Sequence, residues 1–196
     1  ITRNVFRTLL DKTPPDTTID AGPSGTTGAT NATFDFSSEA FATLECRLDG
    51  GPWADCTSPR SYLALADGQH TVDVRATDTA GNVETTPASR TWTVDTTPPD
   101  TTIASGPPAA TNATSASFGF SSEAGASFEC QLDGGAWTSC TSPKSYTGLG
   151  EAQHTFRVRA TDTVGNTDAS PASRTWTVDL TPPNTTIASG PSGPTN

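Results

Sequence analysis

The sequence predicts an all-β protein of tandem antiparallel β-sandwiches with a repeat of 84 residues, each repeat carrying one hairpin disulfide. Two observations lead to this prediction. The segment TPPDTTI at 13–19 returns at 97–103, and again at 181–187 with Asn184 in place of the aspartate. Within each repeat, turn-forming residues separate short segments in which hydrophobic residues alternate with polar ones, which is typical of strands rather than helices.

The repeat defines the domain organisation that we expect. Residues 13–96 and 97–180 form two complete units, and residues 181–196 align with the start of a following repeat. Residues 1–12 align with the last strand of a unit. We expect this segment to be the terminal strand of a preceding repeat in a longer array. The alternative is a donor strand that completes the sheet of a neighbouring chain.

Three segments of the first unit show the strand pattern. Residues 32–36, 71–76 and 90–95 each alternate apolar and polar side chains, as a sheet with one buried face requires. The inward side chains that we expect are Phe34, Phe36, Val72, Val74, Ala76, Trp92 and Val94. Several such strands within about 84 residues fit a two-sheet sandwich.

The four cysteines are expected to form one disulfide in each unit. Cys46 and Cys56 flank an Asp-Gly-Gly turn, which is a strong hairpin signal. If the loop centres on Gly51, the two cysteines lie directly opposite each other, within disulfide reach. Cys130 and Cys140 repeat the arrangement. Free thiols and zinc are the alternatives, although this spacing does not fit a zinc site.

Disulfides persist in oxidising compartments, so we expect the chain to be extracellular or at a cell surface. The formal net charge of −10, with only 11 Lys and Arg, argues against nucleic acid as a partner. No apolar run approaches the roughly 18 residues that cross a bilayer, so we expect no membrane insertion.

With these motifs in view, the sequence resembles bacterial Ig-like tandem repeats of surface adhesins and secreted stalks. The matching residues are the run 65–78, the pair Gly81-Asn82 and the closing segment 90–95. The second copy keeps 154–162 and Gly165-Asn166, but has Glu151-Ala152 for Asp67-Gly68. The resemblance implies Ig-like β-sandwiches whose roles are scaffolding, reach and sometimes adhesion.

His70 and His154 are the only histidines, and each stands near the start of a predicted strand. This position is similar to the tyrosine corner of Ig sandwiches, where a polar ring tip bonds the backbone. We therefore expect both histidines, like Trp92 and its equivalent Trp176, to be structural. The sequence has no G-x-S-x-G, H-E-x-x-H or P-loop motif, so we expect no enzymatic activity.

Calcium is the ligand that the acidic residues favour most, and no other cofactor is expected. Inter-sheet loops and the exit of the last strand are expected at one pole of a sandwich, where clustered carboxylates supply calcium ligands. The two candidate sets are Asp78, Asp95 and Asp100, and Asp162, Asp179 and Asn184. The alternative is that the first aspartate of each set caps a turn and the others are solvated.

Three N-x-[ST] sequons mark candidate glycosylation sites at Asn31, Asn112 and Asn184. The function that we expect is a structural repeat in a stiff rod, because Pro-Pro joins the units without a flexible spacer. One alternative is a filament or virion-surface subunit assembled by terminal strand exchange. Another is a carbohydrate- or protein-binding module that uses Trp53 and Trp137. The partners expected are neighbouring repeats or copies of the chain, and a surface glycan or protein.

Overall fold

The computed structural model describes residues 11–189 and 193. The chain forms two compact units, the first containing β1 to β8 and the second β9 to β16. The strands of the first unit are β1 (Thr18–Ala21), β2 (Gly25–Thr27), β3 (Ala32–Ser37), β4 (Thr43–Leu48), β5 (Ala54–Cys56), β6 (Arg60–Tyr62), β7 (Gly68–Thr77) and β8 (Ala88–Val94).

The second unit has the corresponding set of strands, and β9 begins 84 residues after β1. Its strands are β9 (Thr102–Ser105), β10 (Ala110–Thr111), β11 (Ala116–Ser121), β12 (Ser127–Leu132), β13 (Thr138–Cys140), β14 (Lys144–Tyr146), β15 (Ala152–Thr161) and β16 (Ala172–Val178). All regular structure in the described residues is therefore β, and the predicted fold class is confirmed.

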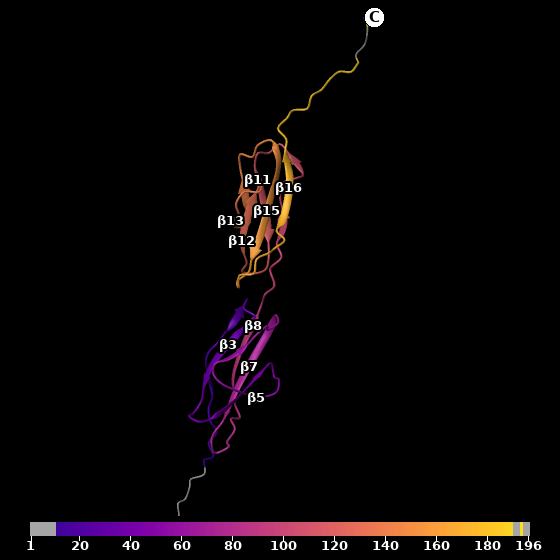
Figure 1. Cartoon of the computed structure of the whole chain (residues 1–196). Helices are drawn as coiled ribbons and strands as arrows, with labels where there is room; N and C mark the ends of the chain where they lie inside the picture. The colour runs from indigo at the N-terminus through magenta and orange to yellow at the C-terminus, as the bar shows by residue number, and fades with distance from the viewer. Residues whose placement is uncertain (1–10, 190–192, 194–196) are drawn as a thin grey trace, which may run out of the picture. The chain divides into compact units, whose positions relative to one another are not determined.

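Each unit is a sandwich of two sheets. In the first unit, β1-β3-β6 forms one sheet and β2-β8-β7-β4-β5 forms the other, so that β3 and β7 belong to different layers (Figure 1). The second unit repeats this order as β9-β11-β14 and β10-β16-β15-β12-β13. This arrangement, with the hairpin β7–β8 at the centre of the larger sheet, is an Ig-like topology.

The larger sheet of each unit is mixed, whereas the sequence predicts antiparallel sheets throughout. β1 pairs antiparallel with β3, but β2 pairs parallel with β8. The chain crosses from one sheet to the other at Gly22 without reversing direction, which leaves β2 parallel to its new neighbour. A Cβ atom on Gly22 would lie 2.2 Å from the Phe34 ring, so the crossing requires glycine there.

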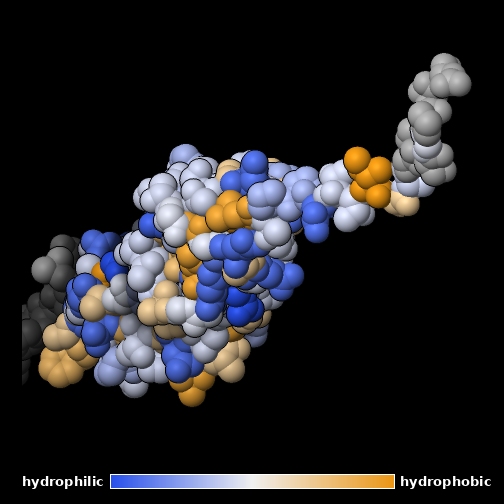
Figure 2. Space-filling model, turned by 90° about the horizontal axis from the view of Figure 1, so that it is seen from above, coloured by the Kyte–Doolittle hydropathy of each residue, from blue (hydrophilic) through white to orange (hydrophobic). Residues whose placement is uncertain are grey.

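The core lies between the two sheets of each unit. Phe34, Val72 and Trp92 are almost fully buried, and they come from β3, β7 and β8. The expected inward side chains of the three predicted segments are all buried in the structure. The outward side chains are mostly polar, and the face seen in Figure 2 is largely blue and white with separate orange areas.

The β4–β5 hairpin forms as predicted, but with another register. Asp49 and Gly50 both have positive φ, at 52° and 68°, as a type I′ turn requires. The loop therefore centres on Gly50 rather than Gly51, and Cys46 pairs with Ala54. The expectation that the two cysteines lie directly opposite each other is wrong, because the disulfide joins them diagonally.

The predicted terminal strand at 1–12 lies outside the described residues, apart from its last two. Residues 181–189, where the sequence predicts the start of a further repeat, form no strand. Ile187 is 88% exposed, whereas its equivalent Ile19 is 9% exposed. The difference arises because β1, which contains Ile19, pairs with β3, and no described strand pairs with residues 181–189.

The turn between β3 and β4 gives a stability prediction. Phe41 has φ 68° and is 89% exposed, and Gly125, with φ 87°, occupies the same place in the second unit. Replacing Phe41 with glycine should stabilise the first unit by about 0.5–1 kcal/mol, since it removes left-handed strain and little buried surface. Urea unfolding measures this change. The reverse change, Gly125→Phe, should destabilise the second unit, and a destabilising Phe41→Gly would show that the exposed ring contributes to folding.

Candidate functional site: the exit end of each unit

A partly buried histidine, His70, lies at the end of the unit at which β8 finishes, which we call the exit end. The Nδ1 atom of His70 lies 2.8 Å from a carboxylate oxygen of Asp49, and Nε2 lies 2.9 Å from the carbonyl oxygen of Ala66. The ring centroid lies 5.5 Å from that of Trp92. The His70 side chain is 11% exposed, so three other segments of the unit enclose it.

The sheet register brings these segments together. His70 pairs with Trp92 across the central hairpin, which places the two rings side by side. Asp49 occupies the β4–β5 turn and also accepts a hydrogen bond from the Thr71 N–H at 2.8 Å. The Nε2 contact reaches four residues back along the chain, which is the backbone contact that the tyrosine-corner comparison predicts.

Hydrogen bonding raises the pKa of both histidines. For His70 the main cause is the bond to the Ala66 carbonyl, followed by the bond to Asp49. For His154 the bond to Asp133 comes first and the bond to the Gly150 carbonyl second. Burial opposes the charged form in both cases, but these bonds outweigh it.

Asp67, which follows Ala66, binds the connector, the segment that leaves the first unit after β8. One carboxylate oxygen of Asp67 accepts from the Thr96 N–H at 2.9 Å and from the Thr96 hydroxyl at 2.8 Å. The other accepts from the Thr97 hydroxyl at 3.2 Å. These bonds, chiefly that from the Thr96 hydroxyl, lower the pKa of Asp67. The connector therefore starts with residues tied to the unit by side chains.

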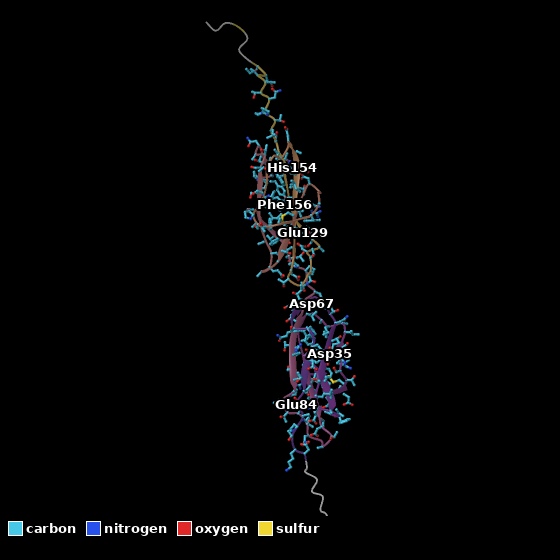
Figure 3. The ribbon with its side chains drawn as sticks, turned by 90° about the vertical axis from the view of Figure 1, so that its left-hand side faces the viewer. Asp35, Asp67, Glu84, Glu129, His154 and Phe156 are labelled. Carbon is cyan, nitrogen blue, oxygen red and sulfur yellow. A yellow bond between two sulfur atoms is a disulfide. The ribbon has the colours of Figure 1, made fainter. Side chains whose placement is uncertain are left out.

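The second unit repeats this arrangement with different residues. His154 lies 2.7 Å from Asp133 and 3.0 Å from the Gly150 carbonyl oxygen, and its ring packs beside Trp176. Glu151 replaces Asp67, and its carboxylate accepts from the Thr181 hydroxyl. Figure 3 shows Asp67 near one end of the first unit and Glu84 near the other.

The carboxylate of Glu84 is buried at the opposite end of the first unit, which we call the entry end. Glu84 is 5% exposed and accepts hydrogen bonds from the Thr17 N–H, the Thr17 hydroxyl and the Ala76 N–H. It thereby joins the segment before β1 to β7. Glu84 was not among the site residues predicted from the sequence. Its signal was an acidic side chain at the same repeat position in both units, because Asp168 is its equivalent and is also buried.

The predicted calcium sets do not form within the units. Asp95 follows β8, beside the start of β7, whereas Asp78 follows the end of β7. Asp162 and Asp179 follow β15 and β16 in the same way. Each pair is therefore split between opposite ends of one hairpin, and the expected convergence on one pole is wrong. The described residues contain no group of three or more acidic, histidine or cysteine side chains suited to a metal.

Asp78 instead stabilises its own loop. Its carboxylate accepts from the Ala80 and Asn82 N–H groups, both at 2.8 Å, and from the Asn82 side-chain amide at 2.6 Å. These bonds, led by that from the Asn82 side chain, lower the pKa of Asp78. The remaining candidates, Asp100 and Asn184, are exposed.

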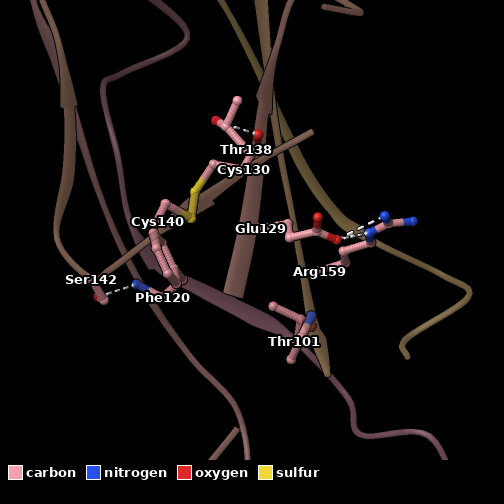
Figure 4. The surroundings of a disulfide bond; sticks show 9 residues. Thr101, Phe120, Glu129, Cys130, Thr138, Cys140, Ser142 and Arg159 are labelled. Carbon is pink, nitrogen blue, oxygen red and sulfur yellow. Dashed lines mark hydrogen bonds and ion pairs between the residues drawn. A yellow bond between two sulfur atoms is a disulfide. The ribbon is translucent and has the colours of Figure 1, made fainter. Parts of the chain in front are cut away.

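The predicted disulfides are confirmed. Cys46 is bonded to Cys56 and Cys130 to Cys140, with Cα–Cα distances of 5.7 and 5.8 Å. The second bridge lies beside the Phe120 ring, and the Glu129–Arg159 ion pair lies on the neighbouring strands (Figure 4). Each bridge ties an edge strand of three residues to the sheet.

The remaining candidate residues lie at the surface. Trp53 lies within cation–π distance of two guanidinium groups, Arg47 at 4.5 Å and Arg75 at 4.3 Å. Trp137 has one such neighbour, Arg159, at 4.5 Å. These contacts place the tryptophans on the outer face of the larger sheet, away from the core. The three sequon asparagines, Asn31, Asn112 and Asn184, are exposed, and glycosylation there stays a prediction.

The fold places both units in the class of Ig-like β-sandwiches. Residues 60–119, from β6 of the first unit into β11 of the second, match the family model of the bacterial Ig-like domain (group 3). The resemblance to bacterial Ig-like repeats is confirmed on this segment. A bacterial Ig-like domain is consistent with a structural role for this chain.

Three solved structures are among those that match this chain. The fibronectin(III)-like modules of CbhA from Clostridium thermocellum are 18% identical, with 83% of this chain and 94% of theirs covered and a TM-score of 0.39. A bacterial ice-binding adhesin is 16% identical, with 86% and 66% covered and a TM-score of 0.47. An I-band fragment of titin is 10% identical, with 85% and 66% covered and a TM-score of 0.44.

No curated protein sequence is similar enough to count as a match. The described residues form no helix of the length and apolar character that spanning a membrane would need.

Proposed function

We propose that the chain is a structural, non-catalytic repeat of an extracellular or cell-surface protein, and that its units form a stiff rod in a stalk, adhesin or fibre. One observation carries the proposal. The connector that leaves the first unit is bound by Asp67 through Thr96 and Thr97, and the Pro98-Pro99 pair follows directly. A connector that is tied at its start and continues as polyproline has little freedom to bend.

The other features of the units support this role. A sandwich with a modest core gains stability from a covalent bridge across its hairpin, and both units have one. Disulfides also fit an oxidising compartment outside the cytosol. The partners in this proposal are neighbouring repeats of the same kind, joined through connectors with the same Thr-Pro-Pro sequence.

Rotational diffusion tests the stiffness of the connector. In the wild-type chain, 15N relaxation should show both units tumbling as one elongated body. Replacing Pro98 and Pro99 with glycine should free them, so that each unit tumbles with a shorter correlation time of its own. The matched control replaces Pro14 and Pro15, the same motif before the first unit, and should leave the coupling unchanged. Independent tumbling of the wild-type units at every pH, from mildly acidic to alkaline, would overturn the proposal.

A further inference from the structure

The two hydrogen-bond partners of each histidine define its protonation state. Nδ1 of His70 faces the Asp49 carboxylate and Nε2 faces the Ala66 carbonyl, and both of these groups can only accept hydrogen bonds. A neutral imidazole has a single N–H, so it would leave one nitrogen lone pair pointing at an acceptor. Only the imidazolium donates to both. The same holds for His154 between Asp133 and Gly150.

We propose that protonated His70 and His154 act as pH-sensitive clamps on the chain that leaves each unit. The clamp is closed while the ring has two N–H groups, because it then holds the β4–β5 turn and the loop before β7 together. The carboxylate is the stronger acceptor and keeps the Nδ1–H, so the proton that leaves is the one on Nε2. Its loss breaks the bond to the Ala66 carbonyl, and the loop before β7 is released. The equivalent loop in the second unit precedes β15.

The loop passes the effect to the connector. Ala66, which binds the ring, directly precedes Asp67, which accepts from Thr96 and Thr97. Movement of this loop displaces the carboxylate that holds the connector. In the second unit, Gly150 binds the ring and Glu151 accepts from Thr181. The order of histidine, carbonyl, acid and connector threonine therefore occurs in both units, although the acid and its neighbours differ.

Among the residues that the structure describes, the charged group that faces each ring is a single carboxylate. For His70 it is Asp49, whereas β8 contributes the uncharged indole of Trp92 and the loop contributes a carbonyl. For His154 it is Asp133, with Tyr146 also near that carboxylate. Burial, with a smaller effect of the Asp133 charge, raises the pKa of Tyr146, so its hydroxyl stays neutral while the histidine titrates.

The sign of the pH dependence follows from these contacts. The pKa of each histidine is higher in the folded chain than its ordinary value of about 6.5. The clamp therefore stabilises the exit end fully below that ordinary value and weakens as the pH rises through the folded pKa. We expect the loop before β7 and the connector to be held more strongly in mildly acidic than in alkaline solution.

NMR of the full chain tests the protonation state directly, because the chain has only two histidines. Because the folded pKa of each histidine is raised, long-range 1H–15N spectra should show His70 and His154 mostly with both ring nitrogens protonated at about pH 6.5, the ordinary histidine pKa. In Asp49→Asn, the pKa of His70 should fall while that of His154 stays unchanged. Neutral rings at this pH in the wild type would overturn the proposal.

Amide exchange tests the link to the connector. Relative to its intrinsic rate, the Thr96 N–H of the wild type should exchange faster above the folded pKa of His70 than below it, because the bonds that hold the connector are then weakened. In His70→Gln, this relative rate should be high and independent of pH, while the second unit, as internal control, should keep its dependence. If the relative exchange rate of the Thr96 N–H does not change as His70 titrates, the clamp proposal is overturned even if the ring is charged.

A pH-dependent stiffness of the rod would rest on the proposed function, whereas the clamp itself does not. If the units tumble together at low pH and separately at high pH, both proposals are supported. If ring protonation and Thr96 exchange behave as expected but the wild-type units tumble independently at every pH, only the rod fails. If the units tumble together at every pH with neutral rings, only the clamp fails.

Discussion

Replacing Trp92 with alanine should destabilise the first unit by about 3–5 kcal/mol, the largest effect that we expect from a single substitution. Trp92 is 1% exposed and packs with its ring 4.9 Å from Phe34, between the two sheets. Alanine would leave a cavity that the surrounding strands fill only in part. Urea unfolding followed by the amide signals of each unit measures the loss and assigns it to the first unit.

Two variants make this experiment decisive. Trp176→Ala is the matched control, since Trp176 is also 1% exposed, and its loss should fall on the second unit. Trp92→Phe keeps most of the aromatic volume and removes an indole N–H that finds no acceptor among the described residues. It should therefore cost less than the alanine variant, and it gives a measurable value if the alanine variant does not fold. A cost below about 1 kcal/mol for alanine would contradict the core packing.

Removing the first disulfide, by replacing both Cys46 and Cys56 with alanine, should destabilise that unit by about 2–3 kcal/mol. The bridge closes a loop with a sequence separation of 10, which restricts the unfolded chain, and it ties β5 to β4. Urea unfolding of the oxidised variant against the wild type measures the change.

The second bridge supplies the control for this prediction. Replacing Cys130 and Cys140 should produce a loss of similar size in the second unit, because the loop has the same length. Reduction of the wild type should reproduce both losses together. If a bridge-free unit unfolds at the same urea concentration as the wild-type unit, the bridges do not contribute to stability in this way.

The expected convergence of Asp78 and Asp95 on one pole of the sandwich is where the sequence prediction was wrong. Asp78 directly follows β7 and Asp95 directly follows β8, so the expectation that both lie just after a strand is correct. Antiparallel pairing puts the two strand ends at opposite poles, since β8 returns along β7. The distance between two residues in a sheet depends on strand direction, which the local pattern does not encode.

The histidine was found from the sequence, but its chemistry was not. The position of His70 near the start of a strand predicted a structural ring with a backbone contact. Its second partner, Asp49, lies 21 residues earlier in a turn whose register the sequence misplaced. Glu84 was missed for a similar reason, because its hydrogen-bond donor Thr17 is 67 residues away.

The sequence by itself determined the β class, the position of three strands and one hairpin in the first unit, the pairing of the cysteines and the similarity of the two units. These features depend on local alternation, turn residues and fixed spacing, all of which are properties of neighbouring residues. The tertiary structure decided the parallel placement of β2, the diagonal bridge, the separation of the aspartates and the two acceptors around each histidine. These features depend on which distant segments the sheets bring into contact, and a short stretch of sequence carries no record of that.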